Sequence, residues 1–136
     1  MISKVDKIIT SGKRKRAVAR AVLTSGNGKI TINKKNYKSL QLFDRLKIEE
    51  PLRIAEHIIG KADFNVDISV RGGGEKGQIE AARLALAKAI VKHSGVAVED
   101  AYFDYDRSLL VADVRRKEAY KPGDSKARRK RQTSYR

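Results

Sequence analysis

The chain has 136 residues, which suggests one domain with a modest core, and its net charge of +15 is large for that length. It contains no cysteine, so a disulfide framework and a cysteine-based zinc or redox site are excluded. No apolar run approaches the roughly 20 residues of a membrane span, and neither a signal-peptide block nor a lipidation motif is found. These features fit a cytoplasmic protein and argue against a membrane partner.

The positive charge is concentrated at the two ends of the chain. Residues 1–16 carry +5, residues 17–114 carry +2 and residues 115–136 carry +8. A nearly neutral middle between basic ends is typical of a nucleic-acid-binding protein. We therefore expect three parts, which are a flexible leader (1–12), a globular nucleic-acid-binding domain (13–114) and an extended basic tail (115–136).

The first predicted strand follows a basic block made of Lys13, Arg14, Lys15 and Arg16. Residues 17–24 alternate, with one face made of Ala17, Ala19, Ala21 and Leu23. Residues 25–28 (Ser-Gly-Asn-Gly) are a strong turn signal, and residues 29–33 alternate again. Together these segments predict a β-hairpin over 17–33, with the basic block held on the domain surface.

A helix is predicted next, with Pro51 in its first turn, because the missing N–H of proline costs nothing there. Gly60 suits the position after its last residue. The apolar side of this helix is expected to consist of Leu52, Ala55, Ile58 and Ile59. His57 in this helix, like the later His93, has no second ligand at metal-binding spacing, so both are expected to be structural or surface residues.

Residues 64–71 alternate strictly and predict a strand, with a core face made of Phe64, Val66, Ile68 and Val70. A helix over 77–93 follows, ended by Ser94-Gly95. Its buried stripe is expected to consist of Ile79, Ala82, Leu86, Ala89 and Ile90. The acidic and aromatic residues 96–106 predict a short helix or turn with its aromatic side chains packed inward, and residues 108–114 are expected to be the last part of the core.

The basic tail has no apolar periodicity of either 2 or 3.6 residues, so it has no face to bury. Such a segment cannot offset its ordering entropy by burying a core, and we expect it to order only against a polyanion. A tail that merely keeps the protein soluble is the alternative.

The loop between the strand 64–71 and the helix 77–93 matches a dinucleotide-binding fingerprint, with glycines at 72, 74 and 77. No second βαβ half fits in the chain, and Gln78 stands where a phosphate-binding Walker loop needs lysine. We expect instead that backbone N–H groups at the helix N-terminus bind RNA phosphates beside Arg71 and Lys76. A purely structural turn and a nucleotide-binding enzyme remain as alternatives.

No catalytic constellation is present, because cysteine is absent, the two histidines are isolated and no serine lies in a nucleophile elbow. The sequence therefore predicts neither an enzyme, nor a cofactor, nor a metal site, nor a small-molecule substrate.

Three segments carry a family resemblance: GKRKRAVARAVLTSGNGKITIN, VRGGGEKGQIEAARLALAKAIV and KARRKRQTSYR, in that order along the chain. They resemble the signatures of the small-subunit ribosomal protein S-nine family (universal name uS-nine). The resemblance implies an α+β single domain like the second domain of ribosomal protein S-five. That fold has a mostly antiparallel sheet, helices packed on one side and a left-handed β-α-β crossover.

The resemblance also implies a structural constituent of the small-subunit head, bound to rRNA and next to other head proteins. The family's C-terminal arm reaches the anticodon stem-loop of the P-site tRNA, and Arg136 matches its tRNA-contacting arginine. Bacterial relatives usually carry lysine where this chain has Tyr135, and Ser-Tyr-Arg is similar to the archaeal and eukaryotic ending. A free-standing nucleic-acid-binding protein without sequence specificity is the alternative function.

The expected contacts with the two RNAs follow from these arguments. The tRNA-binding residues are expected to be Ser134, Tyr135 and Arg136. The rRNA-binding residues are expected to be Lys13, Arg14, Lys15, Arg16, Arg71, Gly72, Gly73, Gly74, Lys76, Arg115, Arg116, Lys117, Lys126, Arg128, Arg129, Lys130 and Arg131.

Overall fold

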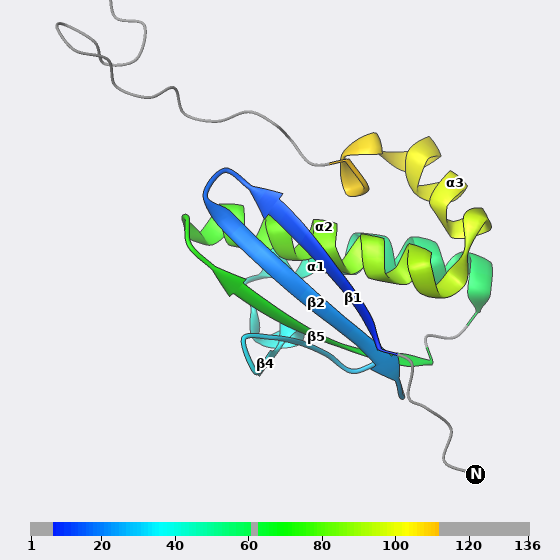
Figure 1. Ribbon diagram of the computed structural model, residues 1–136, viewed down its shortest axis with the longest axis horizontal. Helices are drawn as coiled ribbons and strands as arrows, with labels where there is room; N and C mark the ends of the chain where they lie inside the picture. The colour runs from blue at the N-terminus through cyan, green and yellow to red at the C-terminus, as the bar shows by residue number, and fades with distance from the viewer. Residues whose placement is uncertain (1–6, 61–62, 112–136) are drawn as a thin grey trace, which may run out of the picture.

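The computed structural model describes residues 7–60 and 63–111, which form one α+β domain (Figure 1). Its sheet has five strands in the order β1-β2-β5-β3-β4. The strands are β1 (Ile8–Arg14), β2 (Ala17–Ser25), β3 (Ile30–Ile32), β4 (Lys35–Asn36) and β5 (Phe64–Arg71). The helices are α1 (Leu42–Ile59), α2 (Glu75–Ser94) and α3 (Val96–Tyr105), with short 3₁₀ turns at Tyr37–Ser39 and Arg107–Leu109.

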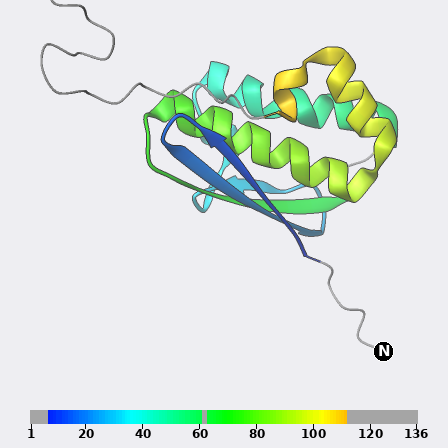
Figure 2. The same cartoon turned by 45° about the horizontal axis from the view of Figure 1, so that its top comes forward.

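The sheet is mixed, because β3 pairs with β5 in parallel while the other neighbouring strands pair antiparallel. The helices lie on one side of the sheet, and α2 runs across β1, β2 and β5 (Figure 2). The predicted α+β class is therefore confirmed for the described residues. None of the described helices is long and apolar enough to cross a membrane.

Small residues let α2 lie close to the sheet. The inward positions of β2 include Ala17, Ala19 and Ala21, all fully buried as predicted. In β1, a Cβ added to Gly12 would collide with the main-chain carbonyl oxygen of Ala81 in α2. This close approach brings together two segments that are far apart in the sequence.

The hairpin predicted over 17–33 is wrong, because β5 lies between β2 and β3. The turn after β2 is held by β5 instead: the side-chain oxygen of Asn65 accepts hydrogen bonds from the main-chain N–H groups of Asn27 and Lys29, both at 3.0 Å. The hairpin in the structure joins β1 to β2, with Lys15 and Arg16 as its two-residue loop. Residues 8–12 therefore belong to β1 and not to a flexible leader.

The prediction that Pro51 begins a helix is also wrong. The helix α1 starts at Leu42, so Pro51 lies in its interior, although Gly60 ends it as expected with a φ of 84°. Ile58, predicted to be on the buried side, is 42% exposed. The main-chain carbonyl of Pro51 accepts a hydrogen bond from the hydroxyl of Tyr102 at 2.7 Å, which joins α1 to α3.

The strand over 64–71 is confirmed with its predicted buried face, and α2 is confirmed although it begins at Glu75 rather than Gly77. In α3, burial of Tyr102 raises the pKa of its phenol well above its ordinary value. The other two aromatic residues of this helix, Phe103 and Tyr105, are exposed, so the prediction that all three pack inward is wrong. Leu109 is buried as expected, and the predicted end of the domain at residue 114 lies outside the described residues.

Candidate nucleic-acid interface

The predicted basic block forms the tip of the β1–β2 hairpin. Lys13 and Arg14 end β1, and Lys15 and Arg16 make the loop. Lys15 has a φ of 54°, in the left-handed region that tight hairpin loops use. Lys13, Lys15 and Arg16 are exposed, whereas Arg14 is only partly exposed.

Arg14 has a different environment because its side chain faces α2. Its Nε lies 2.6 Å from a carboxylate oxygen of Glu80, and Lys47 approaches the other oxygen of that carboxylate at 3.7 Å. The charge of Arg14 is therefore largely balanced inside the protein. Of the four residues of the basic block, Arg14 is the one that joins the hairpin to α2.

The glycine loop between β5 and α2 packs directly against this hairpin tip. Gly72 and Gly73 have φ values of 76° and 67°, and a Cβ at Gly72 would lie 2.7 Å from the main-chain oxygen of Arg16. A Cβ at Gly73 would lie 2.9 Å from the main-chain nitrogen of Ala17. The loop therefore needs glycine both for its backbone conformation and for its contact with the hairpin.

The N-terminus of α2 directly follows the glycine loop, beside the hairpin tip. Gly74 occupies the cap position with a φ of −89° and offers no side-chain cap, so the first-turn N–H groups have no side-chain acceptor at the cap. A helix N-terminus carries partial positive charge and is a common site for phosphate. Glu75 in the first turn partly offsets this charge, and Lys76 beside it is exposed.

The structure thus brings together those of the predicted rRNA-binding residues that lie in the described part of the chain. The hairpin tip, the glycine loop and the start of α2 meet at one end of the sheet, where Val18 pairs with Arg71. We call this surface the basic end of the domain. Its exposed cations are Lys13, Lys15, Arg16, Arg71 and Lys76, and they are accompanied by the exposed Glu75.

Arg20 is a further exposed cation that the sequence did not single out as a site residue. The strand register places it in the row next to Lys13, Val18 and Arg71, on the sheet face without helices. The signal was available, because alternation along residues 17–24 already puts Arg20 on the outward face. Cations therefore continue from the basic end along the open face of the sheet.

The other predicted contacts lie outside the described residues, from Arg115 to Arg136. The histidines are inside them. His93 lies 3.2 Å from Asp63 and packs edge-to-face with the ring of Phe64, while His57 is exposed. Within residues 7–60 and 63–111, no three histidine or acidic side chains gather as metal ligands would.

Residues 12–136 match the family model described as "Ribosomal protein S9/S16". The chain belongs to the ribosomal protein S9/S16 family. The match includes the hairpin tip, the glycine loop and the basic tail. It confirms the family predicted from the sequence, which is a family of ribosomal proteins and not of enzymes.

Archaeal members of the family are similar over most of the chain. The small ribosomal subunit protein uS9 of Methanococcus vannielii is 45% identical over 131 residues, covering 93% of this chain and 96% of that protein. The uS9 proteins of Halobacterium salinarum and Methanococcus maripaludis are 45% and 44% identical, with 93% of this chain covered in both cases. Coverage of 97% and 96% of those two proteins shows that they have nearly the same extent as this chain.

Proposed function

We propose that this chain is a structural constituent of the small ribosomal subunit, in its head, where the basic end of the domain binds rRNA. Family membership carries this proposal, because the relatives are named as small-subunit proteins and match the chain nearly end to end. The geometry supports it, because exposed cations and an uncapped helix N-terminus converge on one surface. Contacts of this kind bind the RNA backbone and carry no base sequence information.

The basic end is suited to a folded RNA rather than to a nucleotide cofactor. Its cations are spread over three chain segments, and the φ values of Gly72 and Gly73 turn the loop against the hairpin. Several phosphates at fixed spacing can engage such a surface together. Arg71 and Arg16 supply planar guanidinium groups that bind phosphate with two donors at once.

Sedimentation of a native lysate tests the place in the subunit. We expect the chain to travel with the small subunit and to remain there after a high-salt wash. Detection only in light fractions would contradict the proposal and favour a free nucleic-acid-binding protein.

We also propose that the tail, residues 115–136, passes through rRNA and contacts the P-site tRNA with Ser134, Tyr135 and Arg136. Deleting residues 132–136 should leave assembly intact and speed tRNA dissociation from the P site, because the terminal guanidinium is lost. The measurement is the dissociation rate of P-site tRNA from subunits that carry the shortened chain. An unchanged rate would contradict the tRNA contact while leaving the subunit assignment in place.

The finer features of the fold belong to the same proposal. The parallel β3–β5 pair needs a crossover, and α1 lies in that connection. We propose that the crossover is left-handed, as in the second domain of ribosomal protein S-five. Superposition of an experimental structure of this chain on that domain would test both points.

A further inference from the structure

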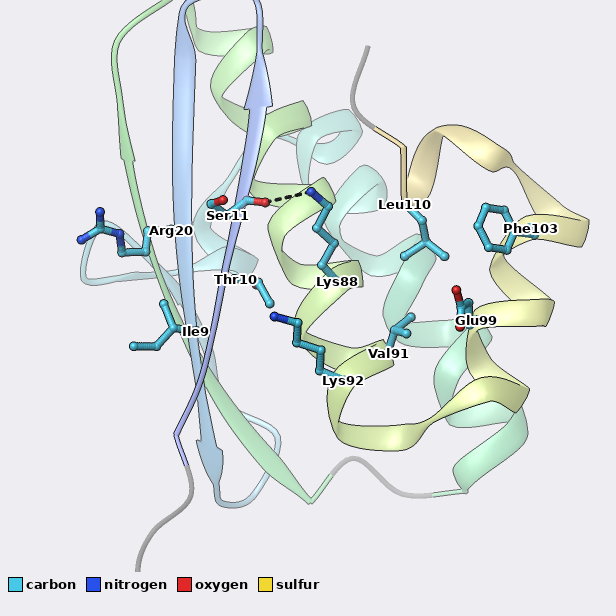
Figure 3. Close-up of a pocket in the computed structure, with 10 residues that line it drawn as sticks. All are labelled: Ile9, Thr10, Ser11, Arg20, Lys88, Val91, Lys92, Glu99, Phe103 and Leu110. Carbon is cyan, nitrogen blue, oxygen red and sulfur yellow. Dashed lines mark hydrogen bonds between the residues drawn. The ribbon is translucent and has the colours of Figure 1, made fainter. Parts of the chain in front are cut away.

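A groove of about 640 Å³ runs along the outer edge of the sheet (Figure 3). The strand β1 forms one wall, Phe103 and Leu110 form the other, and Val91 of α2 lies between them. Ile9 and Phe103 are 58% and 44% exposed, so large apolar side chains border the groove on both sides. Lys13 of the basic end lies on the same strand, and Arg20 of β2 also lines the groove.

The outer side of β1 has no strand beside it in the described part of the chain. Because Lys15 and Arg16 form a two-residue loop, the flanking Arg14 and Ala17 are a hydrogen-bonded pair, and such pairs alternate along the hairpin. Ile9, Ser11 and Lys13 therefore direct their main-chain N–H and C=O groups away from β2, toward the free edge of the sheet. The carbonyl of Ser11 agrees with this orientation, since it accepts a hydrogen bond from Lys88 Nζ of α2 at 3.2 Å.

Two cations reach this edge from α2. The side chains of Lys88 and Lys92 both extend toward β1, and Glu99 on α3 is the acidic residue that lines the groove (Figure 3). Lysines beside an edge strand discourage pairing between identical copies of a protein. They also favour an incoming chain that carries carboxylates.

We propose that this edge accepts an extended segment of a neighbouring ribosomal protein, which adds a strand beside β1; the inference rests on the proposed place of the chain in the small subunit. The main chain of the segment pairs with the outward groups of Ile9, Ser11 and Lys13. Its acidic side chains meet Lys88 and Lys92, and an apolar side chain packs between Val91 and Phe103.

The chemistry of the groove favours a polypeptide over RNA. Donors and acceptors repeat along β1 at strand spacing, and strand addition draws its affinity from such main-chain hydrogen bonds. A phosphate backbone could meet Lys88, Lys92 and Arg20, but it would also face the carboxylate of Glu99 and the carbonyls of β1 that point away from β2, which repel anions. The apolar wall at Val91 and Phe103 offers no group that binds phosphate.

Photo-cross-linking in assembled small subunits tests the proposal. The photoreactive residue p-benzoylphenylalanine replaces Phe103, and in a control protein it replaces Phe43, which is 78% exposed on α1 outside the groove. We expect position 103, but not position 43, to cross-link to one segment of one ribosomal protein, identified by mass spectrometry. Cross-links from position 103 only to rRNA, to residues 112–136 or to a second copy of this chain would overturn the proposal, and so would their absence.

A second variant separates strand pairing from mere proximity. Ser11→Pro removes an N–H that points outward, so the pairing of β1 with β2 is retained, and proline is tolerated on edge strands. The cross-link from position 103 should be lost while the amount of this chain in the subunit stays the same. If Ser11→Pro lowers that amount, Lys92→Glu takes its place, with the same loss expected.

The outcomes also distinguish this inference from the proposed function. Persistence of the cross-link in the folded variant would overturn strand addition and leave the subunit assignment intact. Absence of the unmodified chain from small subunits would instead contradict the proposed function itself.

Discussion

Three consecutive glycines in the β5–α2 loop have different physical requirements. Gly72 and Gly73 have positive φ values and lie against the hairpin backbone, whereas Gly74 has a φ of −89° and open space where a Cβ would be. Only the first two positions need glycine. Since these two hold the loop against the hairpin tip, they also set the shape of the basic end.

The same substitution at two of these positions should have different effects on the free energy of unfolding. Gly72→Ser should lower the free energy of unfolding by about 2 kcal/mol, because a left-handed conformation is costly and the new Cβ meets the Arg16 carbonyl. Gly74→Ser should leave it unchanged or raise it by roughly a few tenths of a kcal/mol, since serine is a good helix cap. Urea denaturation of both variants checks this. Equal losses would show that the loop conformation is not what requires glycine.

Glu49 is a buried acid held between two arginines of its own helix. Arg45 Nε donates to one carboxylate oxygen at 2.9 Å, and Arg53 donates to the other at 3.0 Å. The hydrogen bond from Arg45 holds the pKa of Glu49 below its ordinary value, although burial acts in the opposite direction. The ionised carboxylate is therefore the form that stabilises α1.

A lowered pKa makes this contribution depend on pH. It is fully present above the unfolded-state pKa of about 4.3 and is lost as pH falls through the lower folded-state pKa. Glu49→Gln should therefore lower the free energy of unfolding by up to about 1 kcal/mol at pH 7, and the difference from the unsubstituted protein should shrink below about pH 4. Urea denaturation at both pH values measures it, with the exposed Glu56→Gln as control. A pH-independent difference would contradict the role of the charge.

At the scale of elements, the contact between β1 and α2 depends on the absence of a side chain at Gly12. The nearest atoms to an added Cβ belong to the backbone of α2 and the Cβ of Leu84, so they cannot rotate away. Thr10 adds a hydrogen bond from its hydroxyl to the Ala85 carbonyl at 2.7 Å, and it is buried. The strand and the helix are thus fixed to each other, which also fixes the groove at the sheet edge.

Gly12→Ala should therefore lower the free energy of unfolding by about 1–3 kcal/mol, the usual cost of overpacking a core. Gly77→Ala is the matched control, because its Cβ would have nothing nearer than 3.6 Å and alanine is the better helix former. That variant should be as stable as the original protein or more stable. Thermal unfolding of the two variants measures these differences. A Gly12→Ala variant as stable as the original protein would show that α2 can move away from the sheet.

Across the whole molecule, positive charge is concentrated near the two chain termini, while the middle of the chain is nearly neutral. The fold places part of this charge on the surface defined above as the basic end of the domain. Lys13, Lys15 and Arg16 are exposed there, whereas Arg14 is paired with Glu80. The number of cations in the sequence therefore overstates the number available to RNA. Binding should depend on the exposed ones.

Replacing Lys13, Lys15 and Arg16 together by alanine should reduce the salt dependence of rRNA binding. Each phosphate contact contributes about 0.7–0.9 to the slope of log affinity against log salt, so the loss should be about 2–3. The control replaces Lys34, Lys35 and Lys38 by alanine, because these exposed cations near β4 have the same total charge. Binding to small-subunit rRNA over a range of KCl concentrations gives the slopes. Equal slopes for both variants would argue that the hairpin tip does not bind RNA.

Local patterns in the sequence determined most of the secondary structure of this protein and which faces of its elements are buried. Alternation gave the buried faces of β2 and β5, helical periodicity gave the buried stripe of α2, and Gly60 and Gly95 marked helix ends. The uneven charge indicated nucleic acid before any contact was known. These properties depend on neighbours in the chain, so they can be read from one segment at a time.

Only the tertiary structure decided which segments lie side by side. Alternation over 17–33 predicts two strands, but the pattern is the same whether these strands pair with each other or β5 lies between them. Asn65 of β5 holds the turn that suggested the hairpin. Arg14 is read from the sequence as an available cation, yet Glu80 of α2 pairs with it. Strand neighbours and ion pairs depend on the packing of the whole chain, because long-range contacts compete with one another for the same surfaces.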